Sequence, residues 1–316
     1  MSERSRSQPQ SQGTLALTLK RVLSWGIFIA FAAGVEWWLG WASLLAPWTE
    51  LDAGQLVIAA LLLVSSYLLR AWRVRDYFRD ELAGRFWPTF RLATLHNLMN
   101  NLLPMRAGEI SFPVLMQRYF AIGPTRSVSV LLWFRLLDLQ VILTLAAAAL
   151  LVGLDAPAWF WPLWLVILPM PWLVYALRRP MLARLQGRTG GISRRIAEAL
   201  EALPATAGPL FRALGWTWAN WLVKLAGLAW VLLALLPMPT AAAWLGAIAG
   251  DLTTVLPLHA PGGFGTYEAG VIAALLPFGL DAQVVATAAI NLHLFLLASS
   301  LLAGLLAWLI PVKPSD

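Results

Sequence analysis

Long apolar runs are the feature that most limits what this chain can fold into. A helix needs about 20 predominantly apolar residues to cross the hydrocarbon core of a bilayer. Six runs come close to this length or exceed it, and they are residues 22–45, 53–69, 127–153, 159–177, 210–236 and 282–310. Of the 316 residues, 59% are hydrophobic and only 12% are charged, about half the charged fraction of a soluble domain. The sequence therefore predicts an all-α polytopic membrane protein with about six transmembrane helices.

The connections between the runs alternate in charge. Arginines crowd residues 70–91 and 178–195, whereas the connections of opposite parity carry acidic residues and neither Lys nor Arg. Basic loops stay on the cytoplasmic side, so we expect both termini in the cytoplasm. A disordered tail at residues 1–19 would precede a single transmembrane domain at residues 20–312.

The net charge of +7 fits basic loops that face anionic lipid, and we expect no nucleic-acid partner. The chain has no cysteine, which excludes disulfides and zinc–thiolate sites. The three histidines are too scattered to indicate a metal site, and no cofactor is expected.

Two further apolar stretches, residues 86–120 and 241–280, are interrupted by Pro and Gly. The charge pattern requires the first to begin and end inside and the second to begin and end outside. We therefore expect two oppositely oriented re-entrant helical hairpins. Each half of the chain, about residues 20–153 and 159–312, would then contain two spans, a hairpin and a third span in that order. Because the two halves would have opposite orientations in the membrane, they would form an inverted repeat of the kind that many transporters use.

The second hairpin has a glycine-rich bend. Its bend residues are Pro261, Gly262, Gly263 and Gly265. A half-helix that starts near Thr266 would point its N-terminal amides at this bend, which suits an anion such as phosphate. Glu268 would lie in the first turn, either as a partner of the helix dipole or as a proton carrier or cation ligand. His259 lies beside the bend and is more simply a packing residue than a ligand.

Charged residues three apart occur in the first hairpin, as Arg106 and Glu109, and in the third span, as Arg135 and Asp138. Each pair is either a structural ion pair or a place where the arginine meets a phosphate with its planar fork of donors. Three asparagines lie nearby in the sequence, Asn97, Asn100 and Asn101. Their side-chain amides either add hydrogen-bond donors and acceptors to the site or form hydrogen bonds with the backbone where the helix is interrupted.

Lys224 and Asp251, both in apolar surroundings, could form an ion pair with each other. The alternatives for them are a structural bridge without further function or a lysine that extends to the interface.

The segments NNLLPMRAGEISFPVLM and PGGFGTYEAGVIAALL resemble the two signature segments of the flippase-like membrane domain family, the lysylphosphatidylglycerol synthase transmembrane region. The resemblance covers nearly all of residues 20–312. It implies a lipid-translocating or lipid-handling role in a bacterial or archaeal plasma membrane. The matching positions are Pro104, Arg106, Gly108, Glu109, Pro261, Gly262, Gly263, Gly265 and Glu268. Aminoacyl-transferring members carry a soluble catalytic domain after the membrane part, and we expect only the flippase-like portion here.

These observations predict a transporter, not an enzyme, that moves an anionic or phosphate-bearing lipid between leaflets of a bacterial inner membrane. A membrane phospholipid or a lipid-linked substrate would be its partner, and Arg106 and Arg135 would hold the headgroup. Two alternatives stay open: an intramembrane lipid-modifying enzyme that uses the Glu268 carboxylate, and a transporter of small solutes or ions.

Overall fold

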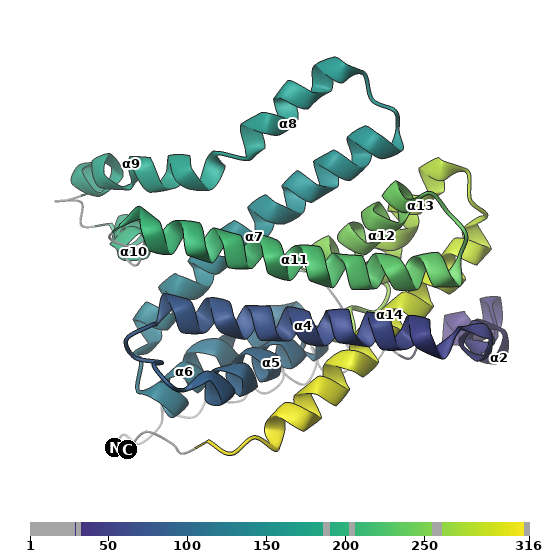
Figure 1. Ribbon diagram of the computed structural model, residues 1–316, viewed down its shortest axis with the longest axis horizontal. Helices are drawn as coiled ribbons and strands as arrows, with labels where there is room; N and C mark the ends of the chain where they lie inside the picture. The colour runs from purple at the N-terminus through teal and green to yellow at the C-terminus, as the bar shows by residue number, and fades with distance from the viewer. Residues whose placement is uncertain (1–28, 30–32, 186–189, 202–205, 255–260, 313–316) are drawn as a thin grey trace, which may run out of the picture.

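A computed structural model describes residues 29, 33–185, 190–201, 206–254 and 261–312 (Figure 1). Every regular element in these ranges is a helix. Four of the helices in the described ranges are long and apolar enough to cross a membrane, which confirms the prediction of an all-α, multi-pass membrane protein. They are α4 (Ala53–Tyr77), α7 (Pro124–Gly153), α11 (Ala207–Leu235) and α14 (Ala282–Trp308).

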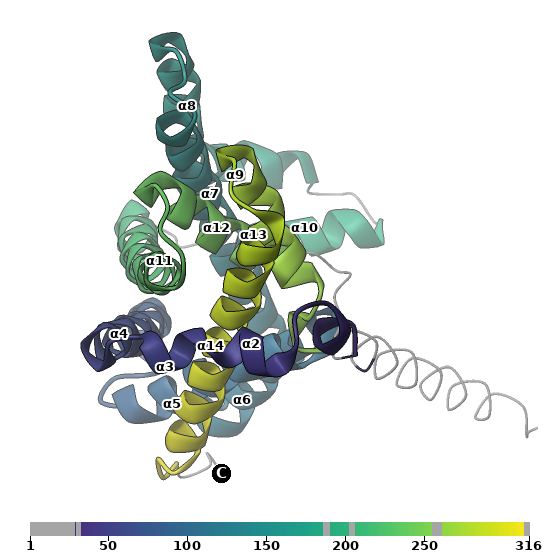
Figure 2. The ribbon, with the colours of Figure 1, turned by 90° about the vertical axis from the view of Figure 1, so that its right-hand side faces the viewer.

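The predicted span at residues 159–177 is broken. It consists of α8 (Trp161–Ile167) and α9 (Met170–Leu185), which meet at a bend of 40°. Pro169 lies in the break, where it removes a backbone donor and disfavours helix at the residue before it. α8 packs on α7 and projects beyond the other helices (Figure 2). If this bent pair is one span, the described residues contain five candidate spans.

The predicted first span, residues 22–45, lies partly outside the described residues, which include 29 and 33–45 of it. Its described part does not continue as one helix to residue 45. Gly40 takes a left-handed conformation with φ 72° and a new short helix begins there, α2 (Trp41–Leu45), followed by α3 (Pro47–Glu50). Glycine adopts this conformation without the steric cost that a Cβ would bring, and the chain therefore turns at this point.

Each of the two interrupted stretches forms a pair of helices, and each helix of a pair is too short to be a candidate membrane span by itself. The first comprises α5 (Phe86–Leu102), the 3₁₀ segment η1 (Pro104–Ile110) and α6 (Ser111–Phe120). α6 folds back against α5, and both pack close to η1. We call this unit the first hairpin.

The second hairpin comprises α12 (Thr240–Thr253), the short 3₁₀ turn η3 (Pro261–Gly263) and α13 (Thr266–Leu275). α12 and α13 pack closely against each other. The tips of the two hairpins meet, because η1 contacts η3. Both tips lie in the middle of the helix bundle (Figure 1).

Two apolar cores hold the hairpins. One core surrounds the first hairpin and includes Phe112 and Met116 of α6 together with Phe134 of α7. The other surrounds the second hairpin and includes Tyr267 and Val271 of α13. The long helices α4 and α11 run side by side through both (Figure 1).

Candidate functional site

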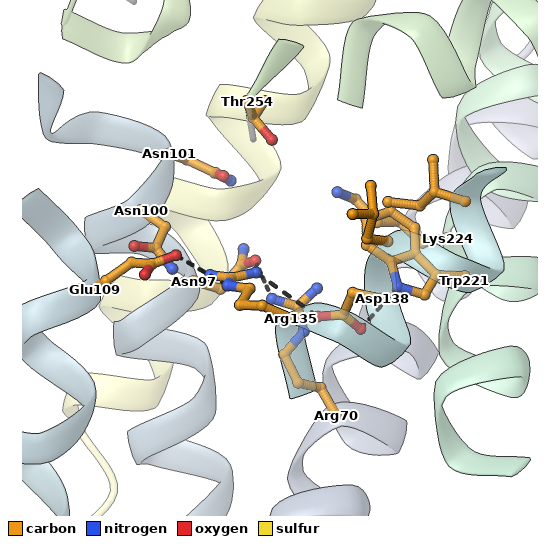
Figure 3. Close-up of a pocket in the computed structure, with 12 residues that line it drawn as sticks. Arg70, Asn97, Asn100, Asn101, Glu109, Arg135, Asp138, Trp221, Lys224 and Thr254 are labelled. Carbon is orange, nitrogen blue, oxygen red and sulfur yellow. Dashed lines mark hydrogen bonds and ion pairs between the residues drawn. The ribbon is translucent and has the colours of Figure 1, made fainter. Parts of the chain in front are cut away.

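A pocket lies between the first hairpin and the long helices α4, α7 and α11 (Figure 3). Its lining comes from α4, α5, η1, α7, α11 and the end of α12, and consists of Arg70, Asn97, Asn100, Asn101, Glu109, Arg135, Asp138, Leu139, Ile142, Trp221, Lys224 and Thr254. The pocket has a volume of about 50 Å³, which is room for a few water molecules. Six of the residues predicted from the sequence line this pocket together: Asn97, Asn100, Asn101, Glu109, Arg135 and Asp138.

Arg135 of α7 forms ion pairs with two of the three predicted carboxylates, Glu109 and Asp138. Its Nε lies 2.9 Å from Oε1 of Glu109, and its Nη1 lies 3.7 Å from Oδ2 of Asp138. The side chains of Arg135 and Glu109 keep 25% and 23% of their surface exposed, so both are accessible from the pocket. The predicted Arg135–Asp138 contact is present, but it is the longer of the two.

Asp138 has a closer partner that the sequence analysis did not identify. Nη1 of Arg73 lies 2.6 Å from its Oδ1, and the indole Nε1 of Trp221 donates to the same oxygen at 2.9 Å. Nη1 of Arg73 also donates to Oγ1 of Thr217 at 3.0 Å. Asp138 therefore ties α4 and α11 to α7 beneath the pocket.

Arg70 of α4 is the second arginine that the sequence analysis left out of the site. Its Nη1 donates to Oδ1 of Asn97 at 2.7 Å, and no carboxylate in the described ranges lies within ion-pair distance of it. The sequence does contain a feature that predicts this position of Arg70. No helix breaker separates the apolar run 53–69 from Arg70 and Arg73, so α4 continues to Tyr77, and these arginines belong to the helix rather than to the cytoplasmic connection.

Lys224 of α11 supplies the third cation of the lining. Its Nζ lies 2.7 Å from Oδ2 of Asp251, and the two side chains are only 8% and 2% exposed. This confirms the predicted ion pair. The ammonium also lies over the Trp221 ring, 5.1 Å from its centroid.

A hydrogen-bond chain fixes the tip of the first hairpin. The Asn100 amide donates to Nε2 of His96 at 3.1 Å, so the ring proton is on Nδ1, which lies 3.0 Å from Oγ of Ser111. Ser111 donates in turn to the Gly108 carbonyl at 2.6 Å. A Cβ at Gly108 would lie 2.4 Å from the backbone of Met99 and Asn100, which explains why a glycine stands at this motif position.

The bend of the second hairpin has the predicted backbone. Gly262, Gly263 and Gly265 all take positive φ, at 69°, 76° and 83°, and α13 begins at Thr266. Glu268 lies in its first turn, where Oε2 accepts the Gly265 N–H at 2.7 Å. This confirms its predicted place near the helix N-terminus.

Glu268 does not reach the pocket. It is 3% exposed, and its other oxygen, Oε1, lies 2.7 Å from Nδ1 of His293 on α14. Nor are the bend glycines Gly262, Gly263 and Gly265 among the described residues that line the pocket. The predicted residue His259 and the side chains of Arg106 and Pro261 lie outside the described part of the chain.

The chemistry of the pocket suits an anion. Three cations and two carboxylates line it, which leaves one positive charge in excess, and guanidinium groups bind phosphate or carboxylate oxygens with paired, charge-assisted hydrogen bonds. Amides of the asparagines add neutral donors. No group of His, Asp and Glu that could hold a metal ion occurs within the described ranges.

Comparison with curated proteins and with solved structures gives no match. A family model does match the chain. It is that of the lysylphosphatidylglycerol synthase TM region, and it covers residues 23–304, nearly the whole length of the chain and both hairpins. Because this match spans nearly all of its membrane-crossing helices, the chain belongs to the lysylphosphatidylglycerol synthase transmembrane region family.

Proposed function

We propose that this protein moves a lipid with an anionic, phosphate-bearing headgroup between the two leaflets of a bacterial inner membrane. The observation that carries the proposal is the pocket between the first hairpin and the long helices, with Arg70, Arg135 and Lys224 in its lining. Charged groups at this depth are costly and usually functional. The family match supports a role connected with membrane lipid.

The proposed topology has two re-entrant hairpins in an inverted repeat, with both termini in the cytoplasm. Its repeats are about residues 20–153 and 159–312, after a tail at residues 1–19. The arrangement supports it, since the α4–α5 connection and α10 (Gly191–Glu201), both in arginine-rich segments, lie toward one end of the bundle (Figure 1). α12 begins and α13 ends toward the opposite end (Figure 1).

In this mechanism the phosphate would contact Arg70 first. That guanidinium is bound only to a neutral amide among the described side chains, whereas Arg135 and Lys224 already have carboxylate partners. The pocket in this conformation holds only a few waters, so a headgroup can enter only if the helices that line it move apart. The acyl chains would remain in the bilayer during the transfer.

We propose transport rather than catalysis at this site. Both carboxylates of the pocket lining are held by arginines: Glu109 by Arg135, and Asp138 by Arg73 and Arg135. Neither is placed as a free general base.

Purified protein in vesicles of phosphatidylcholine that contain a fluorescent phosphatidylglycerol tests the proposal. A membrane-impermeant quencher reports the exchange of this lipid between leaflets. We expect exchange well above that of protein-free vesicles for the parent and near background for Arg70→Gln. The matched control is Arg79→Gln, because Arg79 also follows the apolar part of α4 but is 61% exposed and pairs with Asp76 at the surface. Equal rates for the parent and empty vesicles would overturn the proposal, and recovery of a chemically altered lipid would indicate an enzyme.

A further inference from the structure

Five aromatic side chains form a continuous surface where α4 ends and α5 begins. Trp72 of α4 lies in the middle, with its ring centroid 4.8 Å from that of Phe86 on α5 and 6.2 Å from that of Trp216 on α11. Phe90 and Trp87 extend the surface along α5, with centroids 6.0 Å apart and Phe90 6.4 Å from Phe86. Trp87 and Trp72 are 60% and 38% exposed, so the surface lies on the outside of the bundle. We call these five side chains the aromatic surface.

Arg75 of α4 lies on the aromatic surface. Its Cζ is 4.9 Å from the centroid of the Trp72 ring, so a cation–π interaction holds the guanidinium in place. The side chain is partly buried, and its Nε has no hydrogen-bond partner in the described ranges. No described carboxylate lies within ion-pair distance of it. The internal segments outside the description, residues 186–189, 202–205 and 255–260, contain no acidic residue that could supply one.

The charges around Arg75 do not balance. The next residue, Asp76, already pairs with Arg79 at 2.8 Å and with Arg212 at 2.9 Å. The exposed Asp80 follows α4 in the connection. Three cations are therefore set against two carboxylates even when Asp80 is counted, and the excess positive charge attracts an anion from outside the chain.

This surface is separate from the pocket. Arg70 and Arg73 of α4 reach inward, to Asn97 of α5 and Asp138 of α7. Arg75 lies roughly 140° around the helix from Arg70, since each residue of an α-helix turns the chain by about 100°. It therefore belongs to the outward face of α4, where the surrounding bilayer is in reach.

We propose that Arg75 and the aromatic surface bind one anionic phospholipid of the surrounding bilayer, at a site distinct from the pocket. The terminal guanidinium nitrogens donate to the phosphate with charge-assisted hydrogen bonds. Tryptophan rings lie at the depth of the headgroups, so the glycerol and the upper parts of the acyl chains rest against the aromatic surface. In the topology proposed above, this lipid belongs to the cytoplasmic leaflet. The binding itself does not depend on transport.

Lipid binding to the full-length protein in detergent tests the proposal. Native mass spectrometry measures the affinity for dioleoyl-phosphatidylglycerol and for dioleoyl-phosphatidylcholine. The parent should bind phosphatidylglycerol more tightly than phosphatidylcholine. Arg75→Gln should bind phosphatidylglycerol about fivefold more weakly than the parent, the factor that one basic side chain near a membrane contributes. Because Arg75 has no described ion-pair partner, this variant should melt at the temperature of the parent when no lipid is added.

Two variants are matched controls. Arg126 also lies over an aromatic ring, 5.1 Å from the centroid of Phe78, but it pairs with Glu81. Arg126→Gln should therefore leave the affinity for phosphatidylglycerol unchanged. Arg70→Gln removes a cation of the pocket and should retain the lipid that Arg75→Gln loses.

Glycerol 3-phosphate distinguishes a lipid from a soluble phosphate ester. It has no acyl chains to rest on the aromatic surface, so at the same concentration it should not displace phosphatidylglycerol. Displacement by glycerol 3-phosphate would overturn the assignment to a lipid. Equal phosphatidylglycerol affinity in Arg75→Gln and the parent, or equal affinity of the parent for the two phospholipids, would overturn the site. Absence of leaflet exchange would contradict only the proposed function.

Discussion

Arg73 on α4 and Asp138 on α7 form a buried ion pair of 2.6 Å, with side chains only 5% and 6% exposed. The pair lies directly beside the pocket, and Trp221 of α11 adds a hydrogen bond to the same carboxylate. Three long helices are thus joined at one oxygen. The three helices that carry the cations of the pocket lining are consequently joined to one another at this carboxylate.

We predict that Asp138→Asn destabilises the protein by about 3–5 kcal/mol, because it leaves the Arg73 guanidinium buried without a counter-charge. Thermal unfolding in detergent measures the effect. Asp76→Asn is the control, since Asp76 pairs with the more exposed Arg79 and Arg212, and such pairs contribute about 0–1 kcal/mol. Similar losses in the two variants would contradict the structural role of the Arg73–Asp138 pair.

For the Lys224–Asp251 pair we predict that the stability of the protein and its rate of lipid exchange respond differently to substitution. Lys224→Met and Asp251→Leu should each lower stability by about 3–5 kcal/mol, because each leaves one buried charge alone. The double variant should regain most of that loss. It should nevertheless exchange phosphatidylglycerol more slowly than the parent, since the pocket has lost a cation. A double variant as fast as the parent would remove Lys224 from the proposed ligand set.

Gly108→Ala should disrupt the tip of the first hairpin. The added methyl group would lie 2.4 Å from the backbone of Met99 and Asn100, which cannot yield as a flexible side chain does, and overpacking of this kind costs about 1–3 kcal/mol. Gly215→Ala is the matched control, because no atom lies within 4 Å of its added Cβ and alanine favours a helix interior. Unchanged melting and unchanged lipid exchange in Gly108→Ala would show that the tip does not need this close contact.

The re-entrant topology predicts which side of the membrane each hairpin end faces. The parent has no cysteine, so single cysteines report without background. Ala83→Cys and Thr125→Cys flank the first hairpin and should react with an impermeant thiol reagent only from the cytoplasmic side. Thr240→Cys and Gln283→Cys flank the second and should react only from outside. Labelling of the two ends of one hairpin from opposite sides would mean that it crosses the membrane.

Local patterns in the sequence were sufficient for the membrane class and for the breaks in the two hairpins, but not for the breaks at Gly40 and Pro169. The start of α13 at Thr266 and the place of Glu268 in its first turn both follow from glycines and a helix that begins beside them. The Lys224–Asp251 pair was also predictable, because two opposite charges in apolar surroundings have few other partners. The start of α13 and the place of Glu268 depend on residues close in sequence, and the Lys224–Asp251 pair could be predicted because few charged residues occur in the apolar segments.

Only the tertiary structure decided which buried charges meet. Arg70 was assigned to a cytoplasmic connection by its position after an apolar run, yet packing of α4 against α5 places it at Asn97 in the pocket. Glu268 looked like a residue of the cavity, yet the fold turns it toward His293 on α14. The sequence by itself determined that charged groups lie within the membrane domain and near two breaks. Their partners were decided by how the helices pack, since a buried charge is stabilised by whichever opposite charge or dipole the fold brings within a few ångströms, at any distance along the chain.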